Sequence, residues 1–478
     1  MPTNSSAVDE AMPTDYDDGG NLHTVAPAPR KVDRVPTASN HGPDITDSVR
    51  SAALFTDQYE FTMLSAALAD GTADIPCSFE VFARRLPGGR RYGVVAGTAR
   101  FLGALTRFRF DEDELEVLGT FLDASTLEWL RNYRFTGHVD GYREGDLYLP
   151  GSPILSVRGT FAECVILETL ALSILNHDSA IASAAARMVS SAGSRHMIEM
   201  GSRRTHEEAA VASSRAAYIA GFAATSNLEA VRRHGIPGAG TSAHAFTLLY
   251  NNENGPDEKA AFAAQVRALG VSTTLLVDTY DITQGVANAI EVAGPELGGV
   301  RIDSGDLGVL ARQVRQQLDD LGARNTKIVV SGDLDEYAIA ALRAEPVDSY
   351  GVGTSLVTGS GAPTAGMVYK LVTVDGRPVA KRSSHKESRG GAKSAVRTSR
   401  TTGTAVEEIV FLQGTTPPIE DGLVATELSI PLVRGGEQVE GLGNLNDARA
   451  LLAQRLVSLP WEGLKLSQGE PALPTRFL

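Results

Sequence analysis

The stretch Gly298-Gly-Val-Arg-Ile-Asp-Ser-Gly-Asp-Leu-Gly308 joins a short apolar run to a charged turn. Arg301, Asp303 and Asp306 stand at the end of the run, and Gly305 separates the two carboxylates. Apolar residues then recur at helical spacing, at Leu307, Leu310, Val314 and Leu318. The order strand, charged turn, helix is typical of α/β proteins, which carry their chemistry at the carboxyl ends of their strands. A surface connection with ordinary caps has the same pattern, so this turn alone does not establish a site.

Similar units recur along the chain between residues 190 and 355. Each is a short apolar run that ends in a polar cluster, at Ser202-Arg-Arg, Thr225-Ser-Asn, Thr241-Ser-Ala-His244, Asp278-Thr-Tyr-Asp, Asp303, Ser331-Gly-Asp-Leu-Asp and Gly353-Thr-Ser. Helical patterns follow most of them, over 207–220, 258–269, 282–292 and 336–342. Steps of roughly 20 to 35 residues suit βα units with right-handed crossovers. Seven such runs favour a closed barrel of parallel strands over an open sheet.

The regions on either side have a different character. Residues 1–48 are rich in Asp, Pro, Ser, Thr and Gly, so we expect a disordered acidic tail that cannot bury enough surface to fold. We expect an α+β domain over 49–160, the barrel over 161–370 and a β-rich segment over 371–478. Within these, the patterns predict a helix capped by Thr56 or Asp57, a strand from Cys77, a helix over 115–130, short strands over 137–156, a hairpin from Val368 and a basic loop over 385–400.

Composition excludes some classes of function. The net charge of −14 argues against nonspecific binding to nucleic acid or to an anionic membrane. Polar residues interrupt the apolar stretch 161–189, which therefore predicts a long core helix and no membrane span. The N-terminus lacks the cationic start and apolar middle of a signal peptide. Cys77 and Cys164 form no disulfide framework or metal spacing, and we expect a cytoplasmic protein.

Two glycine-rich strand ends, Ser331-Gly-Asp and Gly351-Val-Gly-Thr-Ser, have the composition of phosphate-binding loops, in which backbone N–H groups hold the anion. Plain turns share this composition, but two such ends on consecutive units favour a phosphate site. Arg301 could contact the phosphate, and Asp303 and Asp306 could bind ribose hydroxyls or, through water, a magnesium ion. Each acid could equally be a helix cap or a partner of the arginine.

His244 follows one of the strand-end turns. A lone histidine is more often a hydrogen-bonded structural residue than a catalytic one, and the ambiguity extends to His177, His206 and His234. No two histidines have metal-ligand spacing. Ser242 is not part of a Gly-x-Ser-x-Gly nucleophile elbow, so the pattern does not indicate a hydrolase triad.

Taken together, these strings resemble the nicotinate phosphoribosyltransferases, which are type II phosphoribosyltransferases. The resemblance runs from about Leu54 to beyond Arg397, through Thr56-Asp-Gln-Tyr-Glu, Gly201-Ser-Arg-Arg, Thr225-Ser-Asn, Gly240-Thr-Ser-Ala-His, Arg301-Ile-Asp-Ser-Gly-Asp, Ser331-Gly-Asp-Leu-Asp, Gly351-Val-Gly-Thr-Ser and Tyr369-Lys-Leu. It implies an α/β fold, an irregular α/β barrel with an α+β N-terminal domain that C-terminal strands complete. It also implies a homodimer with active sites at the subunit interface. The implied reaction joins nicotinate to phosphoribosyl diphosphate, giving nicotinate mononucleotide and diphosphate with ATP hydrolysis, in NAD salvage.

The resemblance also implies roles for single residues. His244 would be the histidine that ATP phosphorylates, and Arg301 and Asp303 would be catalytic. Asp303 and Asp306 would hold Mg²⁺ through water, with ATP as co-substrate. The substrate-binding residues would be Tyr59 of the partner subunit and Arg203, Thr225, Ser226, Asn227, Ser304, Asp306, Gly332, Gly351, Gly353 and Thr354.

Nicotinate is the expected base because the loop Thr225-Ser-Asn227 is neutral here. The related nicotinamide enzymes carry an aspartate in this loop, and a buried aspartate would repel a carboxylate. Arg203 and Arg204 are near in the motif order and would favour the acid. The chain departs from the family pattern in its long tail and in the loop 383–397, which leaves the role of Lys393 open. The alternatives are a quinolinate-type phosphoribosyltransferase, which works without ATP, and a barrel that binds a phosphorylated metabolite without catalysis.

Overall fold

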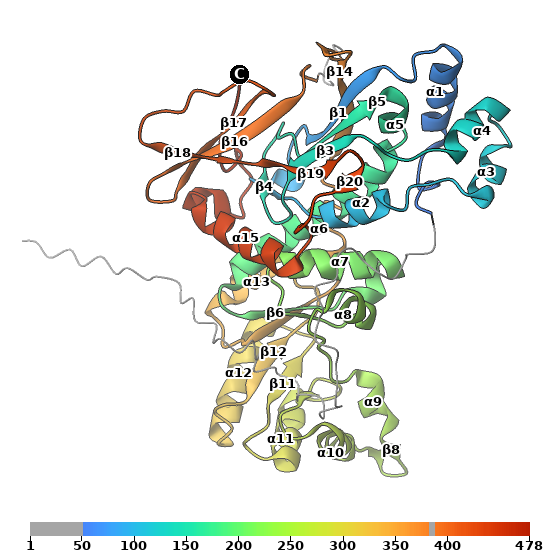
Figure 1. Cartoon of the computed structure of the whole chain (residues 1–478). Coiled ribbons are helices and arrows are strands. Elements are labelled where there is room, and N and C mark those ends of the chain that lie inside the picture. The colour runs from blue at the N-terminus through green and yellow to red at the C-terminus, as the bar shows by residue number, and fades with distance from the viewer. Residues whose placement is uncertain (1–50, 382–387) are drawn as a thin grey trace, which may run out of the picture.

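The computed structural model describes residues 51–381 and 388–478. The predicted acidic tail, 1–48, lies outside these residues. Figure 1 shows two lobes joined by long helices, one lobe built on antiparallel strands and the other on parallel strands.

The parallel lobe is the predicted βα region. Its sheet has the strand order β10-β11-β12-β13-β6-β7 and curls into an irregular half-barrel, which confirms the predicted fold class. The strands are β6 (His196–Glu199), β7 (Ala224–Thr225), β10 (Thr274–Leu276), β11 (Gly299–Ile302), β12 (Lys327–Val330) and β13 (Ser349–Val352). The seventh predicted run, from Pro237, contributes only an isolated bridge between Thr225 and Gly238. Proline has no N–H to donate to a ladder, which limits this run as a strand.

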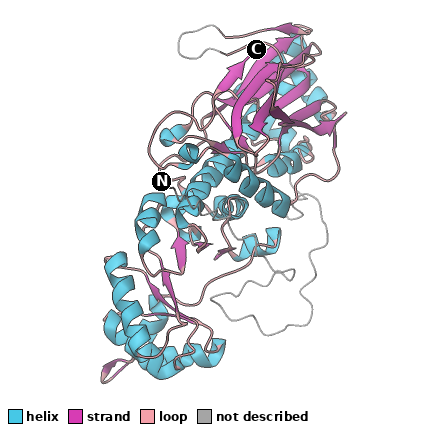
Figure 2. Ribbon diagram, turned by 90° about the vertical axis from the view of Figure 1, so that its left-hand side faces the viewer, coloured by secondary structure: helices cyan, strands magenta, loops and turns pink. Residues whose placement is uncertain are grey.

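Helices cover the parallel strands on the outside (Figure 2). Those predicted from periodicity are α7 (Glu207–Ile219), α10 (Glu258–Leu269), α11 (Ile282–Ala293), α12 (Leu307–Asp320) and α13 (Glu336–Ala341). Aspartates cap four of them, since Asp257, Asp281, Asp306 and Asp335 each accept a hydrogen bond from a backbone N–H of the first turn. Val300, Ile328 and other strand residues pack with these helices in one buried core.

The antiparallel lobe contains strands from both ends of the described chain. Its seven-stranded sheet has the order β15-β14-β1-β5-β3-β19-β20, so C-terminal strands complete the N-terminal domain as predicted. The strands are β1 (Pro76–Ala83), β3 (His138–Tyr142), β5 (Leu155–Thr160), β14 (Met367–Val374), β15 (Arg377–Pro378), β19 (Ser429–Arg434) and β20 (Glu437–Gln438). The predicted boundary at residue 370 falls inside β14, and the domain limits themselves stay predictions.

A second antiparallel sheet corrects the later part of the basic loop predicted over 385–400. Residues 388–392 are without helix or strand, and 385–387 lie outside the described residues. The order of this sheet is β18-β16-β17-β21, and β16 covers Lys393–Arg400. Two basic side chains of β16, those of Lys393 and Arg397, are buried because acids meet them, whereas Arg400 is exposed. Lys393 Nζ lies 2.8 Å from Glu80 Oε2, and Arg397 contacts Asp146 Oδ1 at 2.7 Å and Glu408 Oε2 at 2.9 Å. Lys393 is therefore a structural cation that ties β16 to β1. The other strands of this sheet are β17 (Ala405–Leu412), β18 (Leu423–Glu427) and β21 (Thr475–Phe477).

Long helices join the two lobes. The predicted core helix is present as α5 (Phe161–Val165) and α6 (Glu168–Ala192), and α6 contacts α2 (Thr98–Leu105), α7 and α13. Among the described residues, Phe161–Ala192 is the one helical stretch long and apolar enough to cross a membrane, but most of it is buried, as in a core helix.

Three local predictions need correction. The helix predicted over 115–130 is two helices, α3 (Glu112–Leu118) and α4 (Ala124–Arg131), because Asp123 caps a new start. Asp57 occupies the N-cap position of α1 (Gln58–Ala69) but makes no side-chain cap. The C-terminal segment also contains a helix, α15 (Leu445–Ser458), that was not predicted.

Candidate functional site

Three side chains converge where β11 and β12 end. Arg301 donates from Nε to Ser331 Oγ at 2.8 Å and from Nη2 to Asp303 Oδ1 at 2.8 Å. Ser331 also donates its hydroxyl to Asp303 Oδ1. The parallel register places Ile302 beside Val330, so the polar ends of both strands meet at one edge. The charged turn of the opening stretch is thus part of a cluster built from several strand ends.

A neighbouring strand end adds an acid that the sequence analysis did not assign. Asp278 follows β10, and its side chain is only 1% exposed. Its Oδ2 accepts hydrogen bonds from the Asp303 N–H at 2.8 Å and from Ser304 Oγ at 2.7 Å. Its Oδ1 is buried and has no hydrogen-bond partner within the described chain. A buried carboxylate oxygen without a partner costs free energy, which makes Asp278 a marker of a functional site.

His244 faces these acids. It is the first residue of α9 (His244–Leu249), and its Nε2 lies 4.0 Å from Asp278 Oδ1 and 4.0 Å from Asp303 Oδ2. Its Nδ1 lies 3.1 Å from Thr279 Oγ1. The side chain is 40% exposed, so a ligand can reach the ring. The structure therefore brings the predicted residues His244, Arg301 and Asp303 into one cluster.

The charges of this cluster suit a phosphate ligand with a cation. Burial works against ionisation of Asp303, but the Ser331 hydroxyl and the Arg301 guanidinium outweigh it and hold the pKa of Asp303 below its ordinary value. Asp303 and Asp278 both direct a carboxylate oxygen toward His244. Magnesium is usually held by one or two carboxylates together with water and substrate phosphates, so this donor set fits Mg²⁺. In residues 51–381 and 388–478, no group of three or more His, Cys, Asp or Glu forms an all-protein metal site.

Asp306 caps a helix in the structure, which is the alternative to its predicted role in binding substrate and metal. Its Oδ1 accepts a hydrogen bond from the Val309 N–H at 3.1 Å and caps α12. The helix cap accounts for one oxygen of this carboxylate, and the role in binding substrate and metal stays a prediction.

The glycines at the strand ends are placed where a side chain would not fit. Gly332 has a φ of 104°, and an added Cβ would lie 2.3 Å from the carbonyl oxygen of Asp303. At Gly351 an added Cβ would lie 2.6 Å from Met200 Sδ, and at Gly353 it would lie 3.3 Å from the Met200 carbonyl oxygen. Thr354 begins the short helix α14 (Thr354–Val357). Gly332 is exposed and Gly353 is partly exposed, so their backbone is open to a ligand beside the acid cluster, as in loops that bind phosphate, whereas Gly351 is buried.

Two further loops, after β6 and β7, are tied to each other. Asn227 donates from Nδ2 to Ser202 Oγ at 2.9 Å, and its Oδ1 caps α8 (Leu228–His234) by accepting from the Ala230 N–H. Arg203, in the one-turn helix η3 (Ser202–Arg204), is exposed. Within the described part of the chain its guanidinium has no hydrogen bond or ion pair, which leaves it ready for an anionic ligand.

The hydroxyl of Thr225 points inward. Thr225 is 1% exposed, and its Oγ1 donates to Glu199 Oε2. Ser226, in the same loop, donates its backbone N–H to the Glu199 carbonyl oxygen at 2.8 Å.

Tyr59 is not brought to the cluster. It lies on α1 in the antiparallel lobe, and Figure 1 places α1 at the opposite end of the molecule from β11. The ring is 46% exposed. Burial of the hydroxyl, followed by the nearby carboxylates of Glu168 and Glu60, raises the pKa of Tyr59 to about 12.

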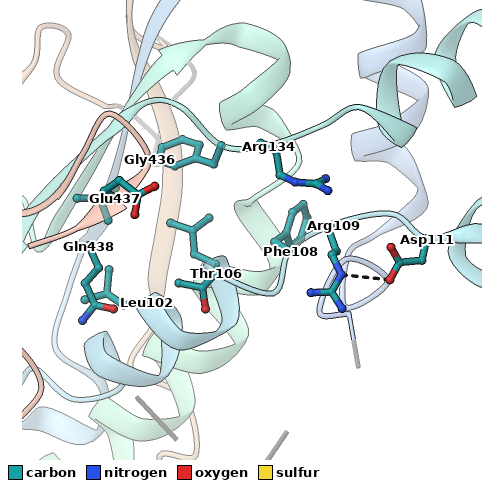
Figure 3. Close-up of a pocket in the computed structure, with 12 residues that line it drawn as sticks. Leu102, Thr106, Phe108, Arg109, Asp111, Arg134, Gly436, Glu437 and Gln438 are labelled. Carbon is teal, nitrogen blue, oxygen red and sulfur yellow. Dashed lines mark hydrogen bonds and ion pairs between the residues drawn. The ribbon is translucent and has the colours of Figure 1, made fainter. Parts of the chain in front are cut away.

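A separate cleft of about 550 Å³ lies in the antiparallel lobe. Figure 3 shows Glu437, Gln438 and Leu102 at the left of the cleft, Thr106 and Phe108 in the middle, and Arg109 and Asp111 at the right. None of the predicted site residues lines it. The strand-end cluster, and not this cleft, is the candidate site because it combines convergent acids, a histidine and an arginine.

The family assignment comes from comparisons along the whole chain. Two sequence-family models match it, described as the nicotinate phosphoribosyltransferase N-terminal domain, over residues 54–176, and the nicotinate phosphoribosyltransferase family, over residues 195–405. A relative, nicotinate phosphoribosyltransferase pncB1 of Mycobacterium tuberculosis, is 66% identical over 446 residues, which are 93% of this chain and 99% of the relative. The chain belongs to the nicotinate phosphoribosyltransferase family. The resemblance in the sequence motifs is thereby confirmed.

Solved structures agree with this family assignment. The crystal structure of human nicotinic acid phosphoribosyltransferase matches with a TM-score of 0.76 at 27% identity, covering 87% of this chain and 96% of the human chain. A nicotinate-nucleotide pyrophosphorylase from Pyrococcus furiosus matches with a TM-score of 0.72 at 24% identity, covering 88% of this chain and 99% of that chain, a likeness that shows the fold alone. The family therefore combines this half-barrel and antiparallel domain in one architecture.

In this phosphoribosyltransferase-family chain, the sequence analysis gave no role to two acids that the structure places at the strand ends. Asp278 and Glu199 each stand at a predicted strand end, but nothing in their local sequence distinguishes them from capping acids. Their significance depends on burial and on partners from distant strands. A search for acids at the last residue of a buried strand or within two residues after it would have selected both.

Proposed function

We propose that the chain catalyses the transfer of a phosphoribosyl group from phosphoribosyl diphosphate to nicotinate, giving nicotinate mononucleotide and diphosphate. The observation that carries this proposal is the 66% identity to a nicotinate phosphoribosyltransferase over 93% of the chain. The strand-end cluster supports it with an arginine, paired carboxylates and glycine loops suited to a sugar phosphate and its cation. The product would enter NAD salvage in the cytoplasm, a location with which the free buried thiols of Cys77 and Cys164 are consistent.

The proposed transfer needs charge stabilisation more than proton transfer. Positive charge develops on the ribose ring as the bond to diphosphate breaks, and the departing diphosphate gains negative charge. Arg301 would bind the phosphate oxygens, and the backbone at Gly332, Gly351 and Gly353 would hold the phosphates in place. Mg²⁺, held by Asp303 and Asp278 with water, would neutralise the leaving group. Arg203 would pair with the carboxylate of nicotinate and orient its ring nitrogen toward the anomeric carbon.

ATP would act through His244 in this proposal. The two carboxylate oxygens near Nε2 favour a proton on that nitrogen, which leaves the Nδ1 lone pair as the nucleophile. Nδ1 would form a bond to the γ-phosphorus of ATP as the bond to the leaving ADP oxygen breaks. The phosphorylated ring would add negative charge beside the ribose site and order the groups that bind phosphoribosyl diphosphate. Hydrolysis of the phosphohistidine after turnover would release phosphate and reset the site.

One assay tests the reaction and its alternatives. Diphosphate release is measured with nicotinate, nicotinamide or quinolinate as the base, each with and without ATP. We expect release with nicotinate, and faster release when ATP is present. Release with quinolinate and no effect of ATP would favour the quinolinate-type alternative. Binding without diphosphate release would favour a metabolite-binding protein.

We also propose a homodimer in which Tyr59 of one subunit reaches the site of the other. The support is that Tyr59 is exposed and distant from the cluster of its own chain, four residues after a further exposed aromatic residue, Phe55.

Complementation between two variants tests the shared sites directly. Tyr59→Ala and His244→Ala chains, each poor in ATP-stimulated turnover, are unfolded, mixed and refolded together. Shared sites should restore about one quarter of wild-type activity, because half of random dimers are hybrids and each hybrid has one intact site. No recovery in hybrids of verified composition would contradict shared sites.

A further inference from the structure

Glu199 is a fully buried acid between two of the loops that carry proposed base-binding residues. It is the last residue of β6, which lies between β13 and β7 in the parallel sheet. Its side chain is 0% exposed. None of the hydrogen bonds of its carboxylate reaches the acid cluster around Asp303.

The two oxygens of the Glu199 carboxylate serve different loops. Oε1 accepts a hydrogen bond from the backbone N–H of Gly201, directly before the η3 turn that carries Arg203. Oε2 accepts from Thr225 Oγ1, at the start of the Thr-Ser-Asn loop, and from Ser214 Oγ of α7 at 2.9 Å. One carboxylate therefore sets the spacing between the loop after β6 and the loop after β7.

Further hydrogen bonds connect Glu199, through Thr225, to Asn227 and Ser202 in the two loops that would contact the base. Thr225 Oγ1 accepts a hydrogen bond from the Asn227 N–H at 3.0 Å, and Asn227 Nδ2 donates to Ser202 Oγ at 2.9 Å. The path runs from Glu199 through Thr225 to Asn227 and back to the first loop at Ser202. It forms a closed ring of contacts with Glu199 at its base.

The chemistry of the donors suits a carboxylate at this position. A backbone N–H can only donate, so one oxygen must accept from Gly201. The two hydroxyls reach the other oxygen, which can accept from both, although Ser214 Oγ also lies 2.9 Å from the Ala210 carbonyl oxygen. Burying an acid among uncharged donors is costly compared with an apolar residue, so stability does not account for the choice of glutamate.

We propose that Glu199 is a positioning residue for the base site, and that it holds Arg203 and Asn227 at the separation that accepts an aromatic carboxylate. This role rests on the proposed transfer to nicotinate. Glu199 does not touch the substrate; it acts through the two loops. Its loss should therefore weaken nicotinate binding and leave the phosphoribosyl site, on β11, β12 and β13, largely unchanged.

The test is Glu199→Gln, which keeps the size of the side chain but replaces one acceptor oxygen by an NH₂ group. If the NH₂ group faces Gly201, two donors oppose each other. If it faces Thr225 and Ser214, both hydroxyls must accept from it and turn their own protons, Thr225 to Ser214 Oγ and Ser214 to the Ala210 carbonyl oxygen. We expect the KM for nicotinate to rise about tenfold, the scale at which supporting groups affect a site. The KM for phosphoribosyl diphosphate and kcat should stay within about twofold of wild type.

Matched variants separate positioning from general damage. Glu258→Gln alters another buried glutamate, which accepts from Asn288 Nδ2 and lies on α10, away from these loops, and it should change no kinetic parameter. Thr225→Val removes the linking hydroxyl and should reproduce the higher nicotinate KM. Thr225→Ser keeps the hydroxyl and should bring the nicotinate KM back down relative to Thr225→Val. The two threonine variants decide the matter if Glu199→Gln does not fold.

Two results would overturn the role of Glu199. One is a nicotinate KM that stays at the wild-type value in both Glu199→Gln and Thr225→Val. The other is an equal change in both KM values and kcat, which indicates general structural damage. A wild-type chain that releases no diphosphate with nicotinate overturns the proposed function, and with it this role. An active wild type with unaffected variants overturns only the role.

Discussion

Asp278 Oδ1 lies 4.0 Å from His244 Nε2, buried and without a hydrogen-bond partner in the described chain. The distance exceeds that of a direct hydrogen bond, but a bridging water or a small movement of the ring would connect the two groups. Asp278 is held on its other side by Asp303 and Ser304. The acid is therefore fixed in place, and the histidine ring, at 40% exposure, is the partner able to adjust.

This relationship predicts that Asp278→Asn and His244→Ala affect ATP coupling in the same way. In His244→Ala, ATP should no longer stimulate diphosphate release, while turnover without ATP persists. Asp278→Asn should lower ATP-stimulated turnover by about tenfold or more, since the amide no longer favours the proton on Nε2. The double variant should lose no more ATP stimulation than His244→Ala alone, although its turnover without ATP should also fall because Asp278 would help to hold Mg²⁺. Full ATP stimulation in His244→Ala would contradict the proposed phosphohistidine.

Asn227→Asp should erode the preference for nicotinate over nicotinamide. Aspartate can still cap α8 through the Ala230 N–H, so the fold should be kept. It would place a negative charge near the carboxylate of nicotinate and an acceptor near the amide of nicotinamide. The measurement is the ratio of kcat/KM for the two bases. An unchanged ratio would show that Asn227 does not determine the preference for nicotinate, and the family assignment would stand.

Gly332→Ala should raise the KM for phosphoribosyl diphosphate by about tenfold or more, because the new methyl would press on the Asp303 backbone. Gly322→Ala is the matched control. Gly322 also has a positive φ, 80°, but an added Cβ there meets no atom within 4 Å. It should lower stability by about 1 kcal/mol through backbone strain and leave KM unchanged. Equal KM values in the two variants would argue against a phosphate site at Gly332.

The buried carboxyl of Glu60 should make the stability of the folded protein depend on pH. Its Oε1 accepts from the Thr169 N–H at 3.0 Å, whereas its Oε2 is buried without a partner in the described chain. Burial, opposed by the Thr169 hydrogen bonds, raises the pKa of Glu60 to about 7, above its ordinary value of 4.5. The folded protein therefore binds more protons than the unfolded chain between these values, so this contribution to stability is full below pH 4.5 and is lost as the pH rises to about 7.

Glu60→Gln should remove that dependence. Urea unfolding at pH 8 should show the variant more stable than wild type by about 1 to 3 kcal/mol, because no buried charge forms. At pH 5 the difference should largely disappear. Glu112→Gln, at an exposed glutamate, should match wild type at both values of pH. A constant difference between Glu60→Gln and wild type at both pH values would show that Glu60 does not titrate in this range.

Sequence patterns predicted the parallel strands well because their apolar runs are buried on both faces and end in polar turns. Arg301 and Asp303 were recognisable for that reason. The pattern failed at Lys393–Arg400, where basic residues suggested a loop. Lys393 and Arg397 are buried there only because Glu80, Asp146 and Glu408 come from other strands. Asp278 and Glu199 were missed for the same physical reason, since their burial and partners depend on tertiary contacts.

The position of β1, between β5 and β14, has a consequence for synthesis of the protein on the ribosome. Residues 76–160 emerge early and can pair β1 with β5 and β5 with β3. The outer edges of β1 and β3 then stay unpaired until β14 and β19 are synthesised, some 200 residues or more later in the chain. At ordinary elongation rates that interval is on the order of ten seconds or more. Unpaired edges invite pairing with other chains, so the nascent antiparallel lobe is a natural client for a chaperone that shields strand edges until the C-terminal strands arrive.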